Sequence, residues 1–103
     1  MSEHAASVEI TNPTGLHARP AVKLTKLAKT FGGAAVQVAL AEAGPWIDAK
    51  SVVKVMAMKA ARGTCIHIRA TGEHAEAALA ALVDLVRRDF DEGHGAPAAD
   101  AAG

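Results

Sequence analysis

A histidine and an arginine stand two residues apart in this chain, directly after a turn. Residues 11–21 read TNPTGLHARPA; the Asn, Pro, Thr and Gly before the histidine are typical of a turn, whereas the residues that follow have helical spacing. Pro20 fits the first turn of a helix, because the N–H that proline lacks would have no acceptor there. We therefore predict a helix that begins at Ala18, with His17 as its N-cap and the imidazole over the amides of Ala18 and Arg19.

The beginning of such a helix can hold an anion beside a nucleophile. The first N–H groups lack intrahelical acceptors and the helix dipole adds positive charge, so phosphate is favoured there. A histidine is substantially neutral, and hence nucleophilic, at cytoplasmic pH. His17 can accept a phosphoryl group that the amides of Ala18 and Arg19 and the Arg19 guanidinium stabilise, while Gly15 permits the tight approach that presents His17 to a partner. On spacing alone, a plain polar cap is the more common role of a histidine near a helix start.

Composition limits the class of protein. The chain has 103 residues, 11 basic and 11 acidic side chains, and 3% aromatic residues. This is enough for one small domain, without the net charge or the aromatic rings that favour nucleic-acid binding. Cys65 is the single cysteine, and the sequence has neither a signal-peptide pattern at its start nor an apolar run of about 20 residues. We expect a cytoplasmic monomer with no nucleic-acid partner and no membrane insertion.

Hydrophobic periodicity predicts seven elements. Alternating apolar residues indicate strands at residues 7–11, 35–41, 46–48 and 64–70, and helical spacing indicates helices at residues 18–31, 51–58 and 73–90. Gly32 and Gly33 are expected to end the first helix with a positive φ, and Arg62 and Gly63 to end the second. Helices over one face of an antiparallel sheet, an α+β fold, would bury eight side chains together: Val8, Ile10, Leu24, Val36, Ile66, Ile68, Leu82 and Val86.

The chain has one predicted domain and a tail. The domain covers residues 1–92, and residues 93–103, rich in Ala, Gly and Pro, have the composition of a flexible tail or linker.

Two surfaces are predicted to contact partners. Lys23 and Lys26 lie on the polar face of the first helix and can steer the protein toward acidic surfaces. Val52, Val53 and Met56 belong to a helix that is too short to bury all its apolar residues, so at least one should offer an apolar contact near the histidine. For the lysines, the alternative is an ordinary solvated helix face. For the short helix, the alternative is that it is fully buried.

Metal binding is not expected. Cys65 and His67 share a strand face, but a structural zinc site needs four ligands. We therefore predict no metal site and no organic cofactor.

Two segments carry a specific resemblance to a known family. GLHARPA at residues 15–21 and AKSVVKVMAMKAARG at residues 49–63 are similar to the active-site signature and the serine-bearing helix of HPr, the histidine-containing phosphocarrier of the bacterial phosphoenolpyruvate-dependent sugar phosphotransferase system. The similarity extends over about residues 8–90. It implies an open-faced sandwich of four antiparallel strands covered on one face by three helices, in the order already predicted.

The resemblance also implies a function. Members of this family accept a phosphoryl group from phosphorylated enzyme I on a ring nitrogen, usually Nδ1, and pass it to a histidine of a IIA-type domain. Applied to this sequence, His17 is the phosphoryl acceptor, Arg19 is the stabilising cation, and Ser51 is the position that a regulatory serine kinase phosphorylates in some relatives. Ser51 also has an ordinary interpretation as a helix N-cap. Such a protein is a carrier within a relay for sugar transport and not a turnover enzyme by itself.

The sequence is also compatible with other functions. A regulatory binding module of the same fold would act on another protein through its phosphorylation state. Residues 44–51 and the tail also resemble carrier domains that serve a dihydroxyacetone kinase, and a nitrogen-related phosphorelay is a further alternative to sugar transport. A small-ligand or nucleic-acid module of similar topology is another class, whose nucleic-acid form is disfavoured by scarce aromatic residues and zero net charge.

Overall fold

The computed structural model describes residues 3–91, which contain four β-strands and three α-helices. In chain order they are β1 (Glu3–Glu9), α1 (Arg19–Lys29), β2 (Ala34–Ala39), β3 (Ile47–Asp48), α2 (Val52–Ala57), β4 (Cys65–Gly72) and α3 (Ala75–Arg87), with a short 3-10 turn, η1 (Asp89–Asp91), at the end. The predicted order of elements is therefore confirmed. The predicted tail, residues 93–103, lies outside the described residues.

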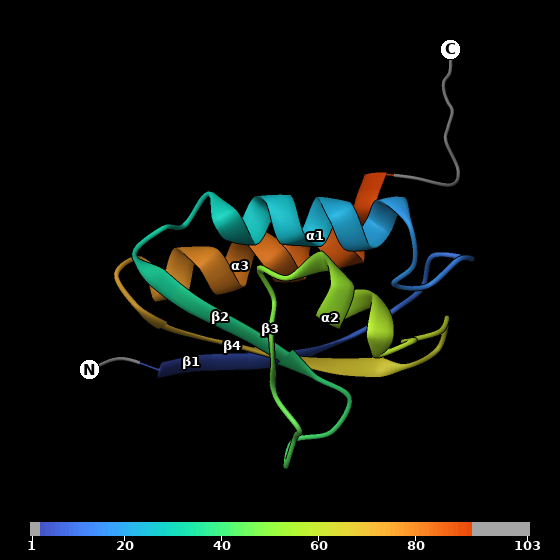
Figure 1. The fold of residues 1–103 in the computed structure, drawn as a ribbon, viewed down its shortest axis with the longest axis horizontal. Helices are drawn as coiled ribbons and strands as arrows, with labels where there is room; N and C mark the ends of the chain where they lie inside the picture. Colours follow the sequence, from blue (N-terminus) through green and yellow to red (C-terminus); the bar gives the residue numbers. More distant parts are fainter. Residues whose placement is uncertain (1–2, 92–103) are drawn as a thin grey trace.

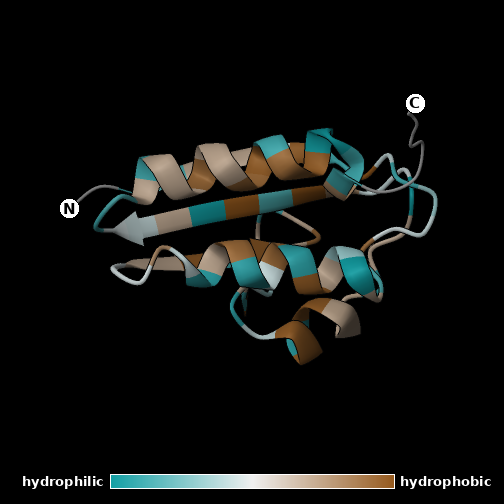
Figure 2. Cartoon of the chain, turned by 90° about the horizontal axis from the view of Figure 1, so that it is seen from above, coloured by the Kyte–Doolittle hydropathy of each residue, from teal (hydrophilic) through white to brown (hydrophobic). Residues whose placement is uncertain are grey.

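The four strands form one antiparallel sheet in the spatial order β1-β4-β2-β3. All three helices lie over the same face of this sheet (Figure 1). Seen from above, the two long helices, α1 and α3, run side by side, and polar and apolar residues alternate along them (Figure 2). The structure is the α+β open-faced sandwich expected from the sequence.

The core lies between the sheet and the long helices. In β4, Ile66 and Ile68 are fully buried, whereas Cys65 is exposed and His67 is half-buried. Because successive side chains of a strand point to opposite faces, this alternation turns the apolar residues of β4 toward the helices. All eight predicted core residues are buried, namely Val8, Ile10, Leu24, Val36, Ile66, Ile68, Leu82 and Val86.

The first strand starts earlier than predicted. β1 covers Glu3–Glu9 instead of residues 7–11, because β4 continues to Gly72 and gives backbone partners to Glu3 through Ala6. The side chains of these four residues are polar or small and carry no alternating apolar signal. Backbone pairing to a long neighbouring strand therefore extends β1 where the sequence pattern does not show it.

The first helix ends before the two glycines that we expected to stop it. α1 ends at Lys29, and Thr30 is its C-cap in a right-handed conformation. Gly32 and Gly33 lie in the following turn and do not take the predicted positive φ. A right-handed final turn ends α1 without a left-handed glycine. The prediction that Arg62 and Gly63 end the second helix is also wrong, because α2 ends at Ala57 with Met58 as a right-handed C-cap.

The third helix also ends earlier than predicted, at Arg87. The backbone φ angles of Asp89, Phe90 and Asp91 are 55°, 58° and 57°, which a right-handed helix cannot contain. Phe90 remains fully buried, and its carbonyl accepts a hydrogen bond from Lys23 Nζ at 2.8 Å. The hydroxyl of Thr11 donates to the Asp89 carboxylate, so η1 joins the end of α3 to α1 and to the segment after β1.

No helix within residues 3–91 has the length and apolar character needed to cross a membrane.

Candidate phosphoryl-acceptor site

The histidine lies in a loop, residues 10–18, between β1 and α1. Asn12 organises the first half of this loop. Its Nδ2 donates to the carbonyl of Gly15 at 2.9 Å and to the Thr14 hydroxyl at 3.2 Å, and the Asn12 carbonyl accepts from the Gly15 amide at 3.2 Å. Asn12 is 1% exposed, and its bond to the Gly15 carbonyl is buried, so this bond forms away from water and holds the loop in one conformation. From sequence, Asn12 is recognisable only as a turn residue.

Gly15 and Leu16 join this loop to the segment that follows α2. The Leu16 amide donates to the Ala60 carbonyl at 2.8 Å, and the Leu16 side chain is buried. Gly15 has a φ of +67°, and a β-carbon there would lie 2.5 Å from the same carbonyl oxygen. A side chain does not fit at that distance, so glycine permits the contact. Figure 1 shows the loop at the same end of the molecule as the end of α2 and the start of β4.

α1 begins one residue later than predicted. Ala18 is the N-cap, with φ 52° and ψ −122°, and Arg19 is the first helical residue. His17 therefore precedes the N-cap, and our assignment of His17 to that position is wrong. The cause is the positive φ of Ala18, which cannot be part of a right-handed helix. Pro20 lies in the first turn, as predicted.

The backbone of Ala18 is strained. A residue other than glycine in such a sparsely populated conformation costs about 1–3 kcal/mol, and it persists only where the surrounding structure holds it. Here Leu16 before it and Pro20 after it are both buried, which fixes the chain on either side. Outliers of this kind are found most often at functional sites.

His17 and Arg19 are both exposed, and α1 has no side-chain cap and no acidic residue in its first turn. The first amides of a helix have no intrahelical acceptor and, with the helix dipole, favour an anion. An accessible imidazole thus stands immediately before an uncapped helix start, with a guanidinium two residues further on. This combination is suited to taking up a phosphoryl group and stabilising its charge.

The two lysines that we predicted as partner contacts differ in their surroundings. Lys26 is exposed on α1. Lys23 is half-buried and donates to the carbonyl of Phe90, 67 residues away in the sequence. Lys23 therefore joins α1 to the end of α3, a role that helical spacing does not reveal.

α2 offers an apolar side chain to solvent. Ser51 is its N-cap, and the Ser51 hydroxyl accepts a hydrogen bond from the backbone amide three residues later at 3.4 Å. The prediction that Ser51 caps this helix is confirmed. Val55 is fully buried, whereas Val53 is 74% exposed and Val52 and Met56 are half-buried. The prediction that so short a helix cannot bury all its apolar residues is also confirmed.

The strand β4 carries the two side chains that could both touch a metal ion. Cys65 and His67 lie on β4, Cys65 exposed and His67 half-buried. Within residues 3–91 there is no group of three or more His, Cys, Asp or Glu side chains placed to hold a metal ion.

At the end of α3, the Asp91 carboxylate accepts a hydrogen bond from Arg88. This bond, with the charges of Arg88 and Lys23, lowers the pKa of Asp91.

Comparison with known proteins identifies the family. The family model described as the PTS HPr component phosphorylation site matches residues 5–88. The chain belongs to the HPr family. Phosphocarrier protein NPr of Escherichia coli (strain K12) is 41% identical over 87 residues, which cover 84% of this chain and 93% of that protein. Phosphocarrier protein HPr of Pseudomonas putida is 39% identical over 90 residues, which cover 86% of this chain and 97% of that protein.

Solved structures of HPr proteins have the same fold. HPr-C-His from Thermoanaerobacter tengcongensis matches with a TM-score of 0.79 and 34% identity, over 91% of this chain and 100% of that one. A phosphocarrier protein HPr from Bacillus anthracis str. Ames matches with a TM-score of 0.73 and 30% identity, over 82% and 96% of the two chains. The resemblance seen in the sequence is confirmed, and the chain is an HPr-family phosphocarrier of the phosphotransferase system. The loop and the start of α1 lie within the residues that match the family.

Proposed function

We propose that this chain is a cytoplasmic carrier that accepts a phosphoryl group on His17 from phosphorylated enzyme I and passes it to a histidine of a IIA-type domain. The observation that carries the proposal is the exposed His17 ring directly before the uncapped start of α1. Membership of the HPr family supports it, because the matching relatives are named phosphocarrier proteins.

Each transfer exchanges one P–N bond for another. A ring nitrogen of His17 attacks phosphorus while the bond between phosphorus and the donor imidazole breaks. The proton that His17 loses from its other ring nitrogen balances the proton that the departing imidazole gains. The same exchange, with His17 as the donor, delivers the group to the acceptor histidine. Neither transfer consumes a metal ion or an organic cofactor.

The start of α1 stabilises the phosphorylated state in this proposal. A phosphoryl group on His17 carries about two negative charges. The amides of Ala18 and Arg19 and the Arg19 guanidinium supply charge-assisted hydrogen bonds to it. Since the site is exposed, water and a partner's own groups compete for these bonds, which keeps the transfer reversible.

Partner docking is proposed on the side of the molecule formed by α1 and α2, which contact each other. Val53 is the most exposed large apolar side chain among the described residues, and Val52 and Met56 extend its surface. Lys26 supplies exposed positive charge, and Lys23 adds a charge that is held within the fold. A carrier must leave each partner quickly, so a small interface of this kind is suitable.

Ser51 is the proposed target of a regulatory serine kinase. Its hydroxyl lies at the start of α2, where a phosphate would be favoured by the helix dipole. The added charge would adjoin the apolar side chains of α2 and raise the cost of desolvating them against a partner. We expect Ser51→Asp to slow phosphoryl uptake from enzyme I and Ser51→Thr, which keeps a capping hydroxyl, to leave it unchanged.

A reconstituted relay tests the proposal. Labelled phosphoenolpyruvate and enzyme I are mixed with this chain and, in parallel, with a IIA domain from a sugar system, a IIA domain from a nitrogen-related system or a dihydroxyacetone kinase. Label should reach at least one acceptor only when the chain is present. His17→Ala should abolish this transfer, and Arg19→Gln should slow it by about tenfold through loss of a charge-assisted bond.

The matched control is His74→Asn. His74 is exposed and has a φ of 59°, a conformation that asparagine tolerates, so this variant should transfer label normally. Label that reaches the acceptors with His17→Ala would contradict the proposal. A His17→Ala variant that kept every function toward its partners would instead favour the regulatory binding module.

A further inference from the structure

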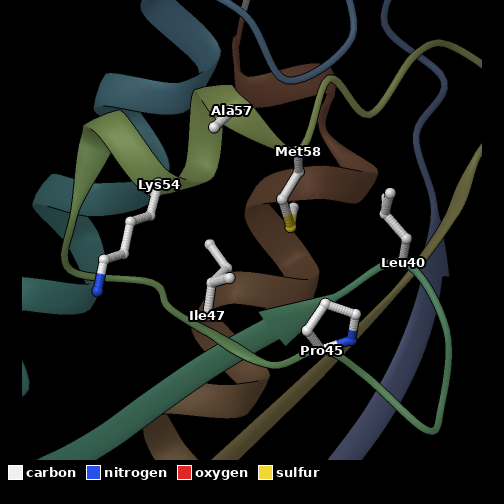
Figure 3. A pocket seen from close by; sticks show the side chains of 6 residues that line it. All are labelled: Leu40, Pro45, Ile47, Lys54, Ala57 and Met58. Atoms are coloured by element: carbon white, nitrogen blue, oxygen red, sulfur yellow. The ribbon is translucent and has the colours of Figure 1, made fainter.

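A pocket of about 340 Å³ lies between the β2–β3 hairpin and α2. The hairpin contributes three of the side chains that line it, and α2 with its C-cap contributes the other three: Leu40, Pro45, Ile47, Lys54, Ala57 and Met58. Figure 3 shows the hairpin side chains on one side and Met58 reaching toward them from α2. The pocket belongs neither to the His17 loop nor to the start of α1.

The pocket has the size and the walls of a small-molecule site. Five of its six lining side chains are apolar, and Leu40 is 45% exposed while Ile47 and Met58 are half-buried. Apolar surface that remains in contact with water is covered favourably by an apolar ligand. Pockets that bind small molecules have volumes of about 300–1,000 Å³ and mostly apolar walls with a few polar groups.

Lys54 supplies the polar group. Among the described residues that line the pocket it alone is charged, and in Figure 3 its ammonium lies at the edge, apart from the other five side chains. Within residues 3–91 this ammonium has no hydrogen bond or ion pair, although the Lys54 amide bonds to Ser51. The carboxylate of Asp48, which follows Ile47, accepts from the Lys50 amide at 2.9 Å and does not line the pocket.

We propose that this pocket binds a small aliphatic carboxylate. The carbon chain would lie among the apolar side chains, and the carboxylate would pair with the Lys54 ammonium, whose flexible stem allows it to turn toward the anion. An apolar body with one negative end matches an apolar cavity with one cation at its edge. This site is separate from the proposed phosphoryl transfer and is tested without any phosphoryl donor, so the two proposals fail independently.

A titration of the unmodified protein gives the first test. Hexanoate is added while the amide and methyl signals of residues 3–91 are followed by NMR, and hexylamine, which has the same carbon chain and the opposite charge, is added in parallel. Hexanoate should cause saturable shifts centred on the methyl groups of Leu40, Ile47 and Met58. Hexylamine should bind about tenfold more weakly, because it gains no ion pair and meets a like charge.

Two variants give the second test. Ala57→Phe places a ring where Ala57 lines the pocket and should abolish the binding of hexanoate; because Ala57 is exposed, the change should not unfold the chain. Lys54→Gln should weaken hexanoate by about threefold, as expected for an exposed ion pair. Lys29→Gln, a lysine on another helix that is also exposed, is the matched control and should bind hexanoate normally.

Several outcomes would overturn the proposal. These are no saturable shift with hexanoate up to about 10 mM, equal binding of hexanoate and hexylamine, or binding that persists in Ala57→Phe. If the pocket instead takes an apolar side chain of another protein, hexanoate and hexylamine bind equally, because only the carbon chain is recognised. If a second copy of this chain fills it, the pocket signals shift with protein concentration before any hexanoate is added. Each of these results contradicts a carboxylate site.

Discussion

Ala18 sets the start of α1 and therefore the position of His17 relative to the first helical amides. Its φ of 52° and ψ of −122° suit glycine far better than alanine. The strained residue is held between Leu16 and Pro20, which are both buried. This backbone strain is located directly beside His17, the residue that we propose as the phosphoryl acceptor.

Ala18→Gly should stabilise the protein by about 1 kcal/mol. Relief of the strain exceeds the extra conformational entropy that glycine gains in the unfolded chain. Urea unfolding followed by circular dichroism measures the change. Ala77→Gly, at an exposed position inside α3, is the control and should lose about 1 kcal/mol. A lower free energy of unfolding for Ala18→Gly than for the unmodified protein would show that Ala18 is not strained.

Gly15→Ala should destabilise the protein by about 2 kcal/mol. The new methyl group would lie 2.5 Å from the Ala60 carbonyl oxygen, at a residue with a φ of +67°, so both steric overlap and backbone strain oppose it. Gly32→Ala is the matched control, because a β-carbon there meets nothing within 4 Å and the φ is not positive; its effect should stay within about 0.5 kcal/mol. Equal effects of the two substitutions would argue against the close contact at Gly15.

At the scale of the elements, repeated patterns could be predicted and single contacts could not. Ile66 and Ile68 in β4 alternate with more exposed residues, and such a pattern reports a buried face whatever the partner is. The start of β1 depends on backbone pairing with β4, which leaves no trace in small and polar side chains. Elements with one buried face are therefore recognised from sequence more securely than their ends.

In the candidate site, too, some features could be predicted from the sequence and others could not. The spacing of His17, Arg19 and Pro20 reveals a helix start with chemistry beside it. The hydrogen bond from the Leu16 amide to the Ala60 carbonyl depends on a segment more than 40 residues away in the sequence. The positive φ of Ala18 is a property of the backbone, which the side-chain pattern does not report. The chemical groups of the site could thus be predicted, but the contacts that hold them could not.

The end of α3 should make stability depend on acid pH. The hydrogen bond from Arg88 and then the charges of Arg88 and Lys23 hold the pKa of Asp91 below its ordinary value of 3.8. A carboxyl whose pKa is lower in the folded state stabilises the fold above the unfolded-state pKa and loses this effect as the pH falls through the folded-state pKa.

Asp91→Asn should therefore lower the free energy of unfolding at neutral pH, by less than about 0.5 kcal/mol because the pair is exposed, and should change nothing near about pH 2. Urea unfolding at both pH values measures this. The control is Glu42→Gln, which changes an exposed carboxylate in the hairpin turn. Its free energy of unfolding should equal that of the unmodified protein at both pH values. If Asp91→Asn lowers the free energy of unfolding equally in acid, the charge of Asp91 is not the cause of the loss.

At the scale of the whole molecule, three helices on one face of the sheet place the loop, α1 and α2 within one connected region. Asn12 organises the loop, the Ala60 carbonyl holds it to the segment after α2, and η1 joins the end of α3 to α1 through Lys23. The fold thus supplies a fixed support for an exposed imidazole. A partner needs to approach only this region to exchange a phosphoryl group.

The most direct test of this account locates the phosphoryl group. The unmodified protein is incubated with phosphoenolpyruvate and enzyme I, digested at a pH that preserves phosphohistidine, and mapped by tandem mass spectrometry. We predict one acid-labile phosphoryl group per chain, on His17, that disappears when pyruvate is added in excess. An unmodified His17 beside an enzyme I that has itself been phosphorylated, or a phosphoryl group on any other residue in its place, would contradict it.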